Sequence, residues 1–396
     1  MLAIGSQRGR VQLVDGRNGG NHLDIRRQSL MLRCVSFSND GLRVLCCGGD
    51  STPKVFLART GENSALLRGH EGRYGCVCKM DGYGLFSPAV GEECPHQSTF
   101  GHAGEVEAGH FSPDGMQVAT AGRDGSVIIW DKRGAIEKRL DEHTRGIRAL
   151  AFSPDGKLLA SGGRDTRVVV WCASSGGMGN ELPHPAGVGA LAFAEDSNNR
   201  ILASGCDDAA VRLWNSATGD LVREITNAHP GGVTALAVAQ GRSEVASGGN
   251  DMAIKLWCLR SGDLQRFQQG HDGSNACTCV PARLRSPGQA RPECKMPGHR
   301  RAVTAVALSP DGLTLASGSA DGTCRLWDIG AGEGPCLGAL LATVVAGSHV
   351  SSVAFGQNAD RACRLAFALA LAPRAGRHSY AGMLEPGLVR MVLDYT

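Results

Sequence analysis

Short runs of apolar and β-branched residues alternate along most of the chain with turns rich in Gly, Asp, Ser and Pro. In residues 143–184, IRALAF ends in a Ser-Pro-Asp-Gly turn, and KLLASGG and TRVVVW follow as further runs. Each run has the length of a β-strand, and the turn residues between them favour hairpins. A weaker fourth run, GNELPH, precedes the next unit. The pattern therefore predicts an all-β fold in which a four-stranded unit recurs.

Four side chains recur in phase with these strands: a His, then a Ser or Thr, an Asp and a Trp. In four of five sets the offsets from the His are 18, 22 and 28 residues, and one set carries two extra residues. The histidines from His102 to His271 are 41 to 45 residues apart, which is the period of four-stranded propeller blades. The five sets are His102, Thr120, Asp124, Trp130; His143, Ser161, Asp165, Trp171; His184, Ser204, Asp208, Trp214; His229, Ser247, Asp251, Trp257; and His299, Ser317, Asp321, Trp327.

Several short motifs accompany these sets. The strand ends Trp130-Asp131 and Trp327-Asp328, the Gly-His pairs such as Gly101-His102, and the SPDG turns at Ser112, Ser153 and Ser309 resemble the WD-repeat family. The resemblance implies a β-propeller in which the Asp accepts a hydrogen bond from the His, the His from the hydroxyl, and the Trp indole donates. A buried, mutually satisfied network of this kind stiffens a blade. We therefore interpret the sets as structural and predict no catalytic residue among them.

The number of blades depends on the irregular units. Five units end at a tryptophan, and a sixth runs from Leu32 to Phe56 with Cys46 in the hydroxyl position. Strands near the N-terminus (LAIGS and GRVQLVD) and near the C-terminus (HVSSVAF, then CRLAFALA at 363–370) are expected to complete a seventh blade, which removes exposed sheet edges. We predict a seven-bladed propeller over 1–371, or eight or nine blades if the short units at 70–102 and 271–299 form blades. Residues 372–396 are expected to be irregular, with GLVRMVLDY as an optional last strand.

Both short units contain a Cys-x-Cys pair and leave two interpretations open. One is a zinc site formed by Cys76, Cys78, Cys94 and His96, or by Cys277, Cys279, Cys294 and His299. The other is a buried strand, because intact units hold alanines at the offsets of these paired cysteines. Cys-x-Cys is not the usual spacing of structural zinc sites. We expect the second and predict no metal or cofactor; degeneration or a missing coding segment would each produce such a short unit.

Composition narrows the function classes. The net charge is +3 without a basic run, so nothing indicates bulk nucleic-acid binding. The longest late apolar run, 365–372, is too short to span a bilayer, and the 15 cysteines do not form a secreted framework. We expect an intracellular protein, cytoplasmic, nuclear or both, with no membrane partner.

The resemblance implies that partners contact the loops beside the structural sets. We predict a non-enzymatic scaffold for other proteins or peptides, acidic or phosphorylated, within a multiprotein complex. The expected partner-binding face comprises Glu105, Arg123, Arg145, Arg164, Asp207, Asn250 and Arg301.

Two other functions compete with the scaffold. Trp130, Asp131 and Arg133 resemble the Trp-Asp-x-Arg ending by which some WD-repeat proteins dock on a cullin-RING ubiquitin ligase adaptor, which would make the chain a substrate receptor. A metal-binding or enzymatic propeller is the more distant alternative. The strand runs VTALAV, IRALAF and VGALAF, expected to face the centre, are apolar and small, so they do not favour chemistry there.

Overall fold

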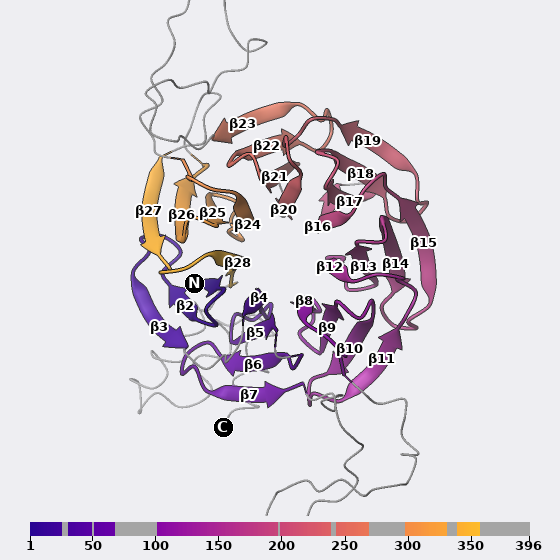
Figure 1. The fold of residues 1–396 in the computed structure, drawn as a ribbon, viewed down its shortest axis with the longest axis horizontal. Helices are drawn as coiled ribbons and strands as arrows, with labels where there is room; N and C mark the ends of the chain where they lie inside the picture. The colour runs from indigo at the N-terminus through magenta and orange to yellow at the C-terminus, as the bar shows by residue number, and fades with distance from the viewer. Residues whose placement is uncertain are drawn as a thin grey trace, which may run out of the picture. The chain divides into compact units, whose positions relative to one another are not determined.

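A computed structural model describes residues 1–25, 31–49, 51–67, 101–196, 199–238, 243–268, 298–330 and 339–356. In this part of the chain it forms 28 β-strands and no helix. The strands build seven antiparallel sheets of four strands each, arranged as the blades of a ring (Figure 1). The all-β propeller expected from the strand pattern is confirmed.

The four strands of a blade are called a to d, from the centre of the ring outward. Blade 1 is β28 (Val350–Phe355), β1 (Leu2–Ser6), β2 (Val11–Val14) and β3 (Asn21–Ile25). Blade 2 is β4 (Leu32–Phe37), β5 (Arg43–Gly48), β6 (Lys54–Leu57) and β7 (Asn63–Leu66). Blade 3 is β8 (Val106–Phe111), β9 (Gln117–Gly122), β10 (Val127–Asp131) and β11 (Ile136–Leu140). Blade 4 is β12 (Ile147–Phe152), β13 (Leu158–Gly163), β14 (Arg167–Cys172) and β15 (Met178–Pro183).

The remaining three blades follow in chain order. Blade 5 is β16 (Val188–Asp196), β17 (Asn199–Cys206), β18 (Val211–Asn215) and β19 (Leu221–Ile225). Blade 6 is β20 (Val233–Val238), β21 (Glu244–Gly249), β22 (Ile254–Cys258) and β23 (Leu264–Gln268). Blade 7 is β24 (Val303–Leu308), β25 (Thr314–Ser319), β26 (Thr323–Asp328) and β27 (Leu340–Val345).

Blade 1 joins the two ends of the ring. The strand β28 pairs antiparallel with β1, so that Leu2 lies opposite Phe355 and Ile4 opposite Val353. Pairing of a C-terminal strand a with N-terminal strands b and c, expected from the sequence, is confirmed. The place beside β28 that we expected for residues 363–370 is occupied by β1, and those residues lie outside the described part of the chain, as do 372–396.

The two short units add no blade to the ring. Strand β4 of blade 2 contacts β8 of blade 3, and β20 of blade 6 contacts β24 of blade 7. These are the blades on either side of the segments 68–100 and 269–297, which the structure does not describe. Because neighbouring blades meet directly at both points, the alternative of eight or nine blades was wrong.

Apolar side chains of adjacent blades share one core at each junction. Trp171 of blade 4 packs with Val127 and Ile129 of blade 3, and Trp327 of blade 7 packs with Ile254 and Leu256 of blade 6. An apolar sheet face must be buried against another element, and each blade buries one face against the blade before it and the other against the blade after it. This dependence is why the ring has to close.

In blades 3, 4 and 7, strands a and b are joined by the predicted Ser-Pro-Asp-Gly turns. In blade 4, the Ser153 hydroxyl donates to Asp155 (2.6 Å) and accepts the backbone N–H of Leu158 (2.9 Å). Gly156 has a φ of +70°, a conformation that glycine adopts without steric cost. The turn therefore needs Ser, Asp and Gly for separate reasons.

Candidate functional site

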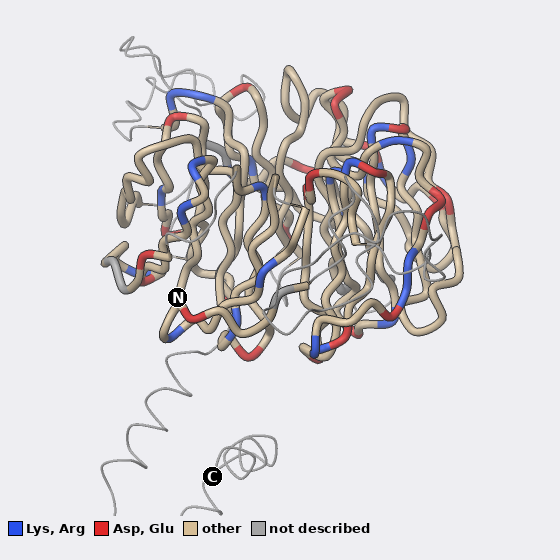
Figure 2. Tube along the Cα trace, turned by 60° about the horizontal axis from the view of Figure 1, so that its bottom comes forward, with Lys and Arg blue, Asp and Glu red and all other residues tan. Residues whose placement is uncertain are grey.

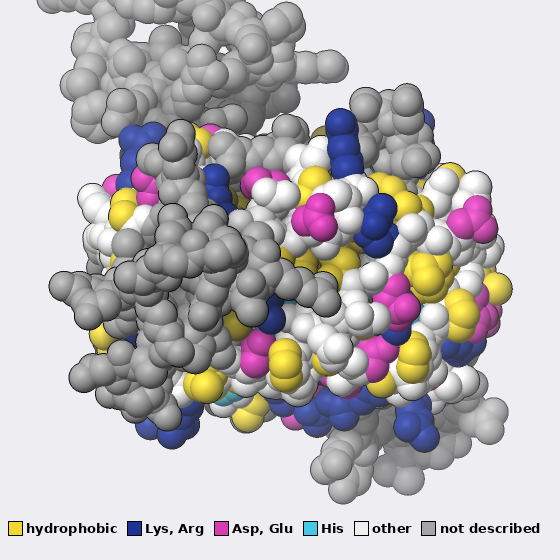
Figure 3. Space-filling view, turned by 90° about the horizontal axis from the view of Figure 1, so that it is seen from above, with side chains coloured by type: hydrophobic (Ala, Val, Ile, Leu, Met, Phe, Trp, Pro, Cys, Tyr) yellow, Lys and Arg dark blue, Asp and Glu magenta, His cyan; other side chains and the backbone are white. Residues whose placement is uncertain are grey.

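Antiparallel strands place two kinds of loop on opposite ends of the ring. The histidine face carries the loops from strand d to the next strand a, with His102, His143, His184, His229 and His299, and the b–c turns. The turn face carries the a–b and c–d turns. Figure 2 shows that many acidic and basic positions lie in loops at these two ends. On the flank seen in Figure 3, basic, acidic and hydrophobic side chains are interspersed.

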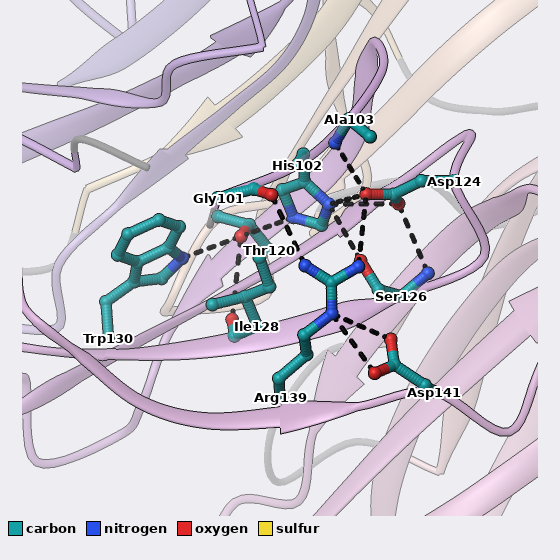
Figure 4. Close-up of polar contacts among 10 residues, drawn as sticks. All are labelled: Gly101, His102, Ala103, Thr120, Asp124, Ser126, Ile128, Trp130, Arg139 and Asp141. Atoms are coloured by element: carbon teal, nitrogen blue, oxygen red, sulfur yellow. Dashed lines mark hydrogen bonds and ion pairs between the residues drawn. The ribbon is translucent and has the colours of Figure 1, made fainter. Parts of the chain in front are cut away.

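The relay of blade 3 links strands b and c, the turn between them and the loop that precedes strand a (Figure 4). The indole Nε1–H of Trp130 donates to the Thr120 hydroxyl (2.7 Å), and His102 Nε2 lies 2.9 Å from the same oxygen. His102 Nδ1 lies 3.1 Å from Asp124 Oδ1, and the N–H of Ala103 donates to Asp124 Oδ2 (2.9 Å). The relay thus ties strand b to strand c and both to the incoming loop.

Blades 4, 6 and 7 repeat this relay. The distances from His Nε2 to the serine hydroxyl are 2.8, 2.6 and 2.7 Å, and those from His Nδ1 to the aspartate are 2.9, 2.7 and 3.0 Å. An ionised carboxylate only accepts hydrogen bonds, so Nδ1 carries the proton and the serine donates to Nε2. These side chains therefore use their hydrogen-bonding groups on one another, within their own blades.

Blade 5 departs from the expected pattern. His184 Nε2 contacts Ser204 (2.8 Å), but its Nδ1 lies 3.0 Å from the carbonyl oxygen of Leu182, and Asp208 pairs instead with Arg212 (2.6 Å). The expectation of a His184–Asp208 hydrogen bond was wrong.

Two substitutions in blade 5 account for the difference. Blades 3, 4 and 6 have a glycine between ring and carboxylate, and a Cβ on Gly122 would lie 2.6 Å from the His102 ring; blade 5 has Cys206 there. Blades 3, 4 and 7 supply a backbone N–H after the His, but Pro185 has none. Blade 6 lacks only the backbone N–H after the histidine, and blade 7 lacks only the glycine. Both keep the hydrogen bond between histidine and aspartate. Blade 5 lacks both.

Burial sets the protonation of the relay. Burial lowers the pKa of His143, His229 and His299, although the neighbouring aspartates act in the opposite direction. For Asp165, burial raises the pKa, but the His143 ring and its other donors outweigh burial and hold that pKa below its usual range. A neutral ring beside a charged carboxylate is the state that the geometry stabilises.

We expect acidification from pH 7 to 5 to destabilise the protein. Unfolded histidines take up protons below a pKa of about 6.5, whereas the buried rings do so only at lower pH, so stability is lost as the pH falls below that value. Burial lowers the pKa of His110, on β8, to about 4, which corresponds to a loss of about 2 kcal/mol at pH 5 from this group. Unfolding temperatures measured from pH 7 to 5 check the trend.

The variant His110→Ala is the matched comparison for that measurement. Blades 4 to 7 have alanine at the same place in strand a, namely Ala151, Ala192, Ala237 and Ala307. The variant should keep its relays and lose part of the acid sensitivity. Equal pH dependence in the variant and the wild type would contradict the role given to His110.

Six ion pairs join charged residues of the histidine face over blades 2 to 5, and we call these residues the ion-pair surface. Its members are Arg33, Glu105, Glu107, Arg123, Arg148, Arg164 and Asp207. The shortest contacts join Arg123 Nε to Glu107 Oε1 (2.6 Å) and Arg148 Nη1 to Asp207 Oδ2 (2.7 Å). Four arginines face three carboxylates, so most of the charge is neutralised within the surface.

Glu107 is the centre of this surface. Its side chain is only 12% exposed, and three arginines approach it: Arg123 closely, and Arg33 and Arg164 at 3.9 Å. The hydrogen bond to Glu107 raises the pKa of Arg123. Glu107 therefore holds Arg123, which the sequence suggested as a free partner contact.

The structure brings together four of the seven expected partner-face residues: Glu105, Arg123, Arg164 and Asp207. Asn250 is exposed and donates to the carbonyl oxygen of Gly231 (2.5 Å). Arg145 and Arg301 are exposed, and neither has an ion pair within the described ranges.

Sequence reasoning missed Arg33, Glu107 and Arg148. They are the second residues of their a strands, in LRCVSF, VEAGHF and IRALAF. The charge at the second position of these strands was the signal that could have identified them. The expectation that strand a is apolar and small did not take it into account. In blades 6 and 7 that position holds Thr234 and Thr304, so the charge is confined to part of the ring.

Arg133 lies on the turn face. The Asp131 carboxylate accepts the backbone N–H groups of Arg133 and Ala135, both at 2.8 Å, which orders this c–d turn. The Arg133 side chain is exposed. Trp130 is fully buried in its relay, so only Asp131 and Arg133 of this motif are available to a partner.

The described residues contain no group of three or more His, Cys, Asp or Glu side chains that could hold a metal ion. The cysteine candidates Cys76, Cys78, Cys94, Cys277, Cys279 and Cys294 lie outside the described part. Within that part, no helix has the length and apolar character needed to cross a membrane.

Seven four-stranded blades closed by the two chain ends, with a relay repeated in phase, define a β-propeller built from sequence repeats. The model of the family described as "WD domain, G-beta repeat" matches residues 94–131, 134–172, 180–215, 219–258 and 290–328. The chain belongs to the WD-repeat family.

Several curated proteins are similar to parts of this chain. Nuclear distribution protein PAC1 of Coccidioides posadasii (strain C735) is 31% identical over 150 residues, 38% of this chain and 30% of that protein. Small ribosomal subunit protein RACK1z of Oryza sativa subsp. japonica is 42% identical over 65 residues, 16% of this chain and 18% of that protein. The U5 small nuclear ribonucleoprotein 40 kDa protein of Dictyostelium discoideum is 30% identical over 152 residues, 35% of this chain and 40% of that protein. The matches thus span less than half the length of each relative.

Proposed function

We propose that this protein is a non-enzymatic scaffold that binds other proteins through its histidine face. The observation that carries the proposal is the ion-pair surface, which covers blades 2 to 5 and is absent from the second strand-a position of blades 6 and 7. A preorganised charged surface gives specificity and faster association more than raw affinity. Relatives named as a ribosomal subunit protein and a ribonucleoprotein component support a place in a multiprotein complex inside the cell.

The chemistry of the partner follows from what the surface leaves unpaired. Arg145 and Arg301 are exposed without ion pairs among the described residues, and Arg164 is held only at 3.9 Å. Arginine binds carboxylate and phosphate groups through two parallel hydrogen bonds. An acidic or phosphorylated segment is therefore the partner that this face favours.

A second candidate is a substrate receptor for a cullin-RING ubiquitin ligase. The exposed Arg133 in its ordered turn favours it, because this motif lies on the turn face and leaves the histidine face for a substrate. The argument rests on motif resemblance, which is weaker than a contact surface.

One affinity purification with quantitative mass spectrometry tests both candidates. The triple variant Arg123→Glu, Arg145→Glu, Arg164→Glu should lose most co-purifying proteins, because its reversed charges repel an acidic segment. Arg133→Ala should lose a ligase adaptor, if one is bound, and keep the rest. The control is Arg59→Glu, an exposed charge in a c–d turn of blade 2. An unchanged set of partners in the triple variant would reject the histidine face as the binding site.

A further inference from the structure

Blade 7 contains a buried cation without a partner. Arg325, on strand β26, is 7% exposed, and its Nε and Nη1 are buried with no hydrogen-bond partner among the described residues. No ion pair to Arg325 occurs among the residues that the structure describes. Burying an unpaired charge is costly, so this side chain needs an explanation that the propeller fold does not supply.

The same position in other blades shows what the fold itself requires. In each of the five blades with a relay, strand c has one residue paired with the relay hydroxyl of strand b: Ile128 in blade 3, Val169 in blade 4, Arg212 in blade 5, Lys255 in blade 6 and Arg325 in blade 7. In blades 3 and 4 the residue is apolar and fully buried. A blade therefore forms without a charge at this place.

The cations of blades 5 and 6 are both paired. Arg212 bonds Asp208 (2.6 Å) and, across to strand d, Glu224 (2.5 Å). Lys255 Nζ lies 3.4 Å from Asp251 and also donates to the carbonyl oxygen of Ala228. In these blades one carboxylate oxygen of the relay aspartate is available to interact with the cation.

In blade 7 both acceptors are missing. His299 Nδ1 and the N–H of Arg300 occupy Asp321 Oδ2, while Thr323 donates to Oδ1 through its N–H and its hydroxyl. The strand-d residue opposite Arg325 is Thr343, where blade 5 has Glu224. Arg325 is left as an excess positive charge at the edge of the histidine face.

One neighbouring cation adds positive charge at this edge, and a nearby loop adds a buried hydroxyl. Burial lowers the pKa of Arg325, and Asp321 acts in the opposite direction. Arg300, exposed in the loop before β24, adds to the lowering. The loop after β27 is tied to the Asp321-Gly322 turn by the bond from Ala346 N–H to the Gly322 carbonyl (2.9 Å). In that loop the Ser348 hydroxyl is buried and also lacks a partner.

We propose that Arg325, with Arg300 beside it, forms an anion subsite for a carboxylate or phosphate group on an acidic segment of a protein partner. The inference rests on the proposed function, because it names a position on the histidine face at which that segment is held. A guanidinium left unpaired inside the protein gains its missing hydrogen bonds when the anion arrives, which is the source of affinity. It lies on blade 7, away from the ion-pair surface of blades 2 to 5.

Stability tests the premise that Arg325 has no structural partner. Arg325→Val copies the residue of blade 4 and should leave the unfolding temperature unchanged or raise it. Arg212→Val, the matched control, removes a paired arginine at the same position in blade 5 and should lower it. A decrease for Arg325→Val as large as that for Arg212→Val would overturn the proposal.

Titration calorimetry tests binding with three synthetic peptides of equal length: one rich in glutamate, one carrying phosphoserines, and one with unmodified serines. We expect the wild type to bind an acidic peptide and not the serine peptide, and Arg325→Val to weaken that binding about tenfold or more. The preferred acidic peptide distinguishes a carboxylate from a phosphate source. Equal binding by the wild type and Arg325→Val, or no binding of either acidic peptide, would overturn the subsite.

Repeating the affinity purification with Arg325→Val separates this inference from the proposed function. Loss of partners in both Arg325→Val and the triple arginine variant supports the subsite. If only the triple variant loses partners, the Arg325 subsite is wrong and the scaffold function stands. If neither loses partners, both fail.

Discussion

Replacing Ser161 by alanine is expected to lower the free energy of unfolding by about 2–5 kcal/mol. The Ser161 hydroxyl accepts from Trp171 Nε1 (2.8 Å) and donates to His143 Nε2 (2.8 Å), and all three side chains are buried. Alanine leaves an indole N–H and an imidazole nitrogen without partners, and each buried unsatisfied group costs about 1–3 kcal/mol. Urea or guanidinium unfolding measures the change.

Two further variants show whether the loss comes from the relay. Ser161→Thr keeps a hydroxyl at this position, as in blade 3, where Thr120 is the relay residue. This variant should retain most of the stability. Thr144→Ala removes an exposed hydroxyl in the neighbouring loop and should change stability by less than about 0.5 kcal/mol. If Ser161→Ala were as stable as Ser161→Thr, the relay would not stabilise the blade.

A chain that ends at residue 346 is expected not to fold into a stable propeller. It lacks β28, whose Val350 and Val353 pack with Leu2 and Ile4 of β1. Removing this strand exposes apolar surface and leaves unpaired those N–H and C=O groups of β1 that face β28. We expect a loss of at least about 5 kcal/mol, comparable with the whole stability of a typical domain. Size-exclusion chromatography, circular dichroism and limited proteolysis detect the failure.

The matched control is a chain that ends at residue 357. It keeps β28 and the bond from Gly356 N–H to the Met1 carbonyl (3.0 Å), and residues 1–357 form one compact unit. This shorter chain should unfold at the same temperature as the full chain. A stable, cooperative fold for the chain ending at 346 would show that closure through β28 is dispensable.

Most of the architecture could be predicted because its signals are local. The turn at Ser153 to Gly156 and the strands around it depend on residues within a few positions of each other. The composite blade could also be predicted, because the N-terminal segment supplies strands b and c without a strand a, and the C-terminal segment supplies a strand a. The blade number required the structure, since the contacts of β4 with β8 and of β20 with β24 show that blades 2 and 3, and blades 6 and 7, are direct neighbours.

The candidate site was less predictable, since each of its features depends on several neighbours at once. Cys206 and Pro185 are both visible in the sequence, but only their combination in one blade removes the His184–Asp208 bond. Arg325 resembles Arg212 in the repeat, and what distinguishes them is the acceptors that Asp321 and Thr343 fail to offer.

By itself the sequence determined the repeated blade and, outside blade 5, its relay, because all four relay members lie within one repeat and their spacing along the strands brings them together. The tertiary structure alone decided how blades combine. Arg33 and Glu105 are 72 residues apart and belong to different blades, and they pair at 3.0 Å only because the ring brings their a strands together. Charges that meet across blades depend on the closed geometry of the whole ring, and the spacing of residues within a repeat does not contain that information.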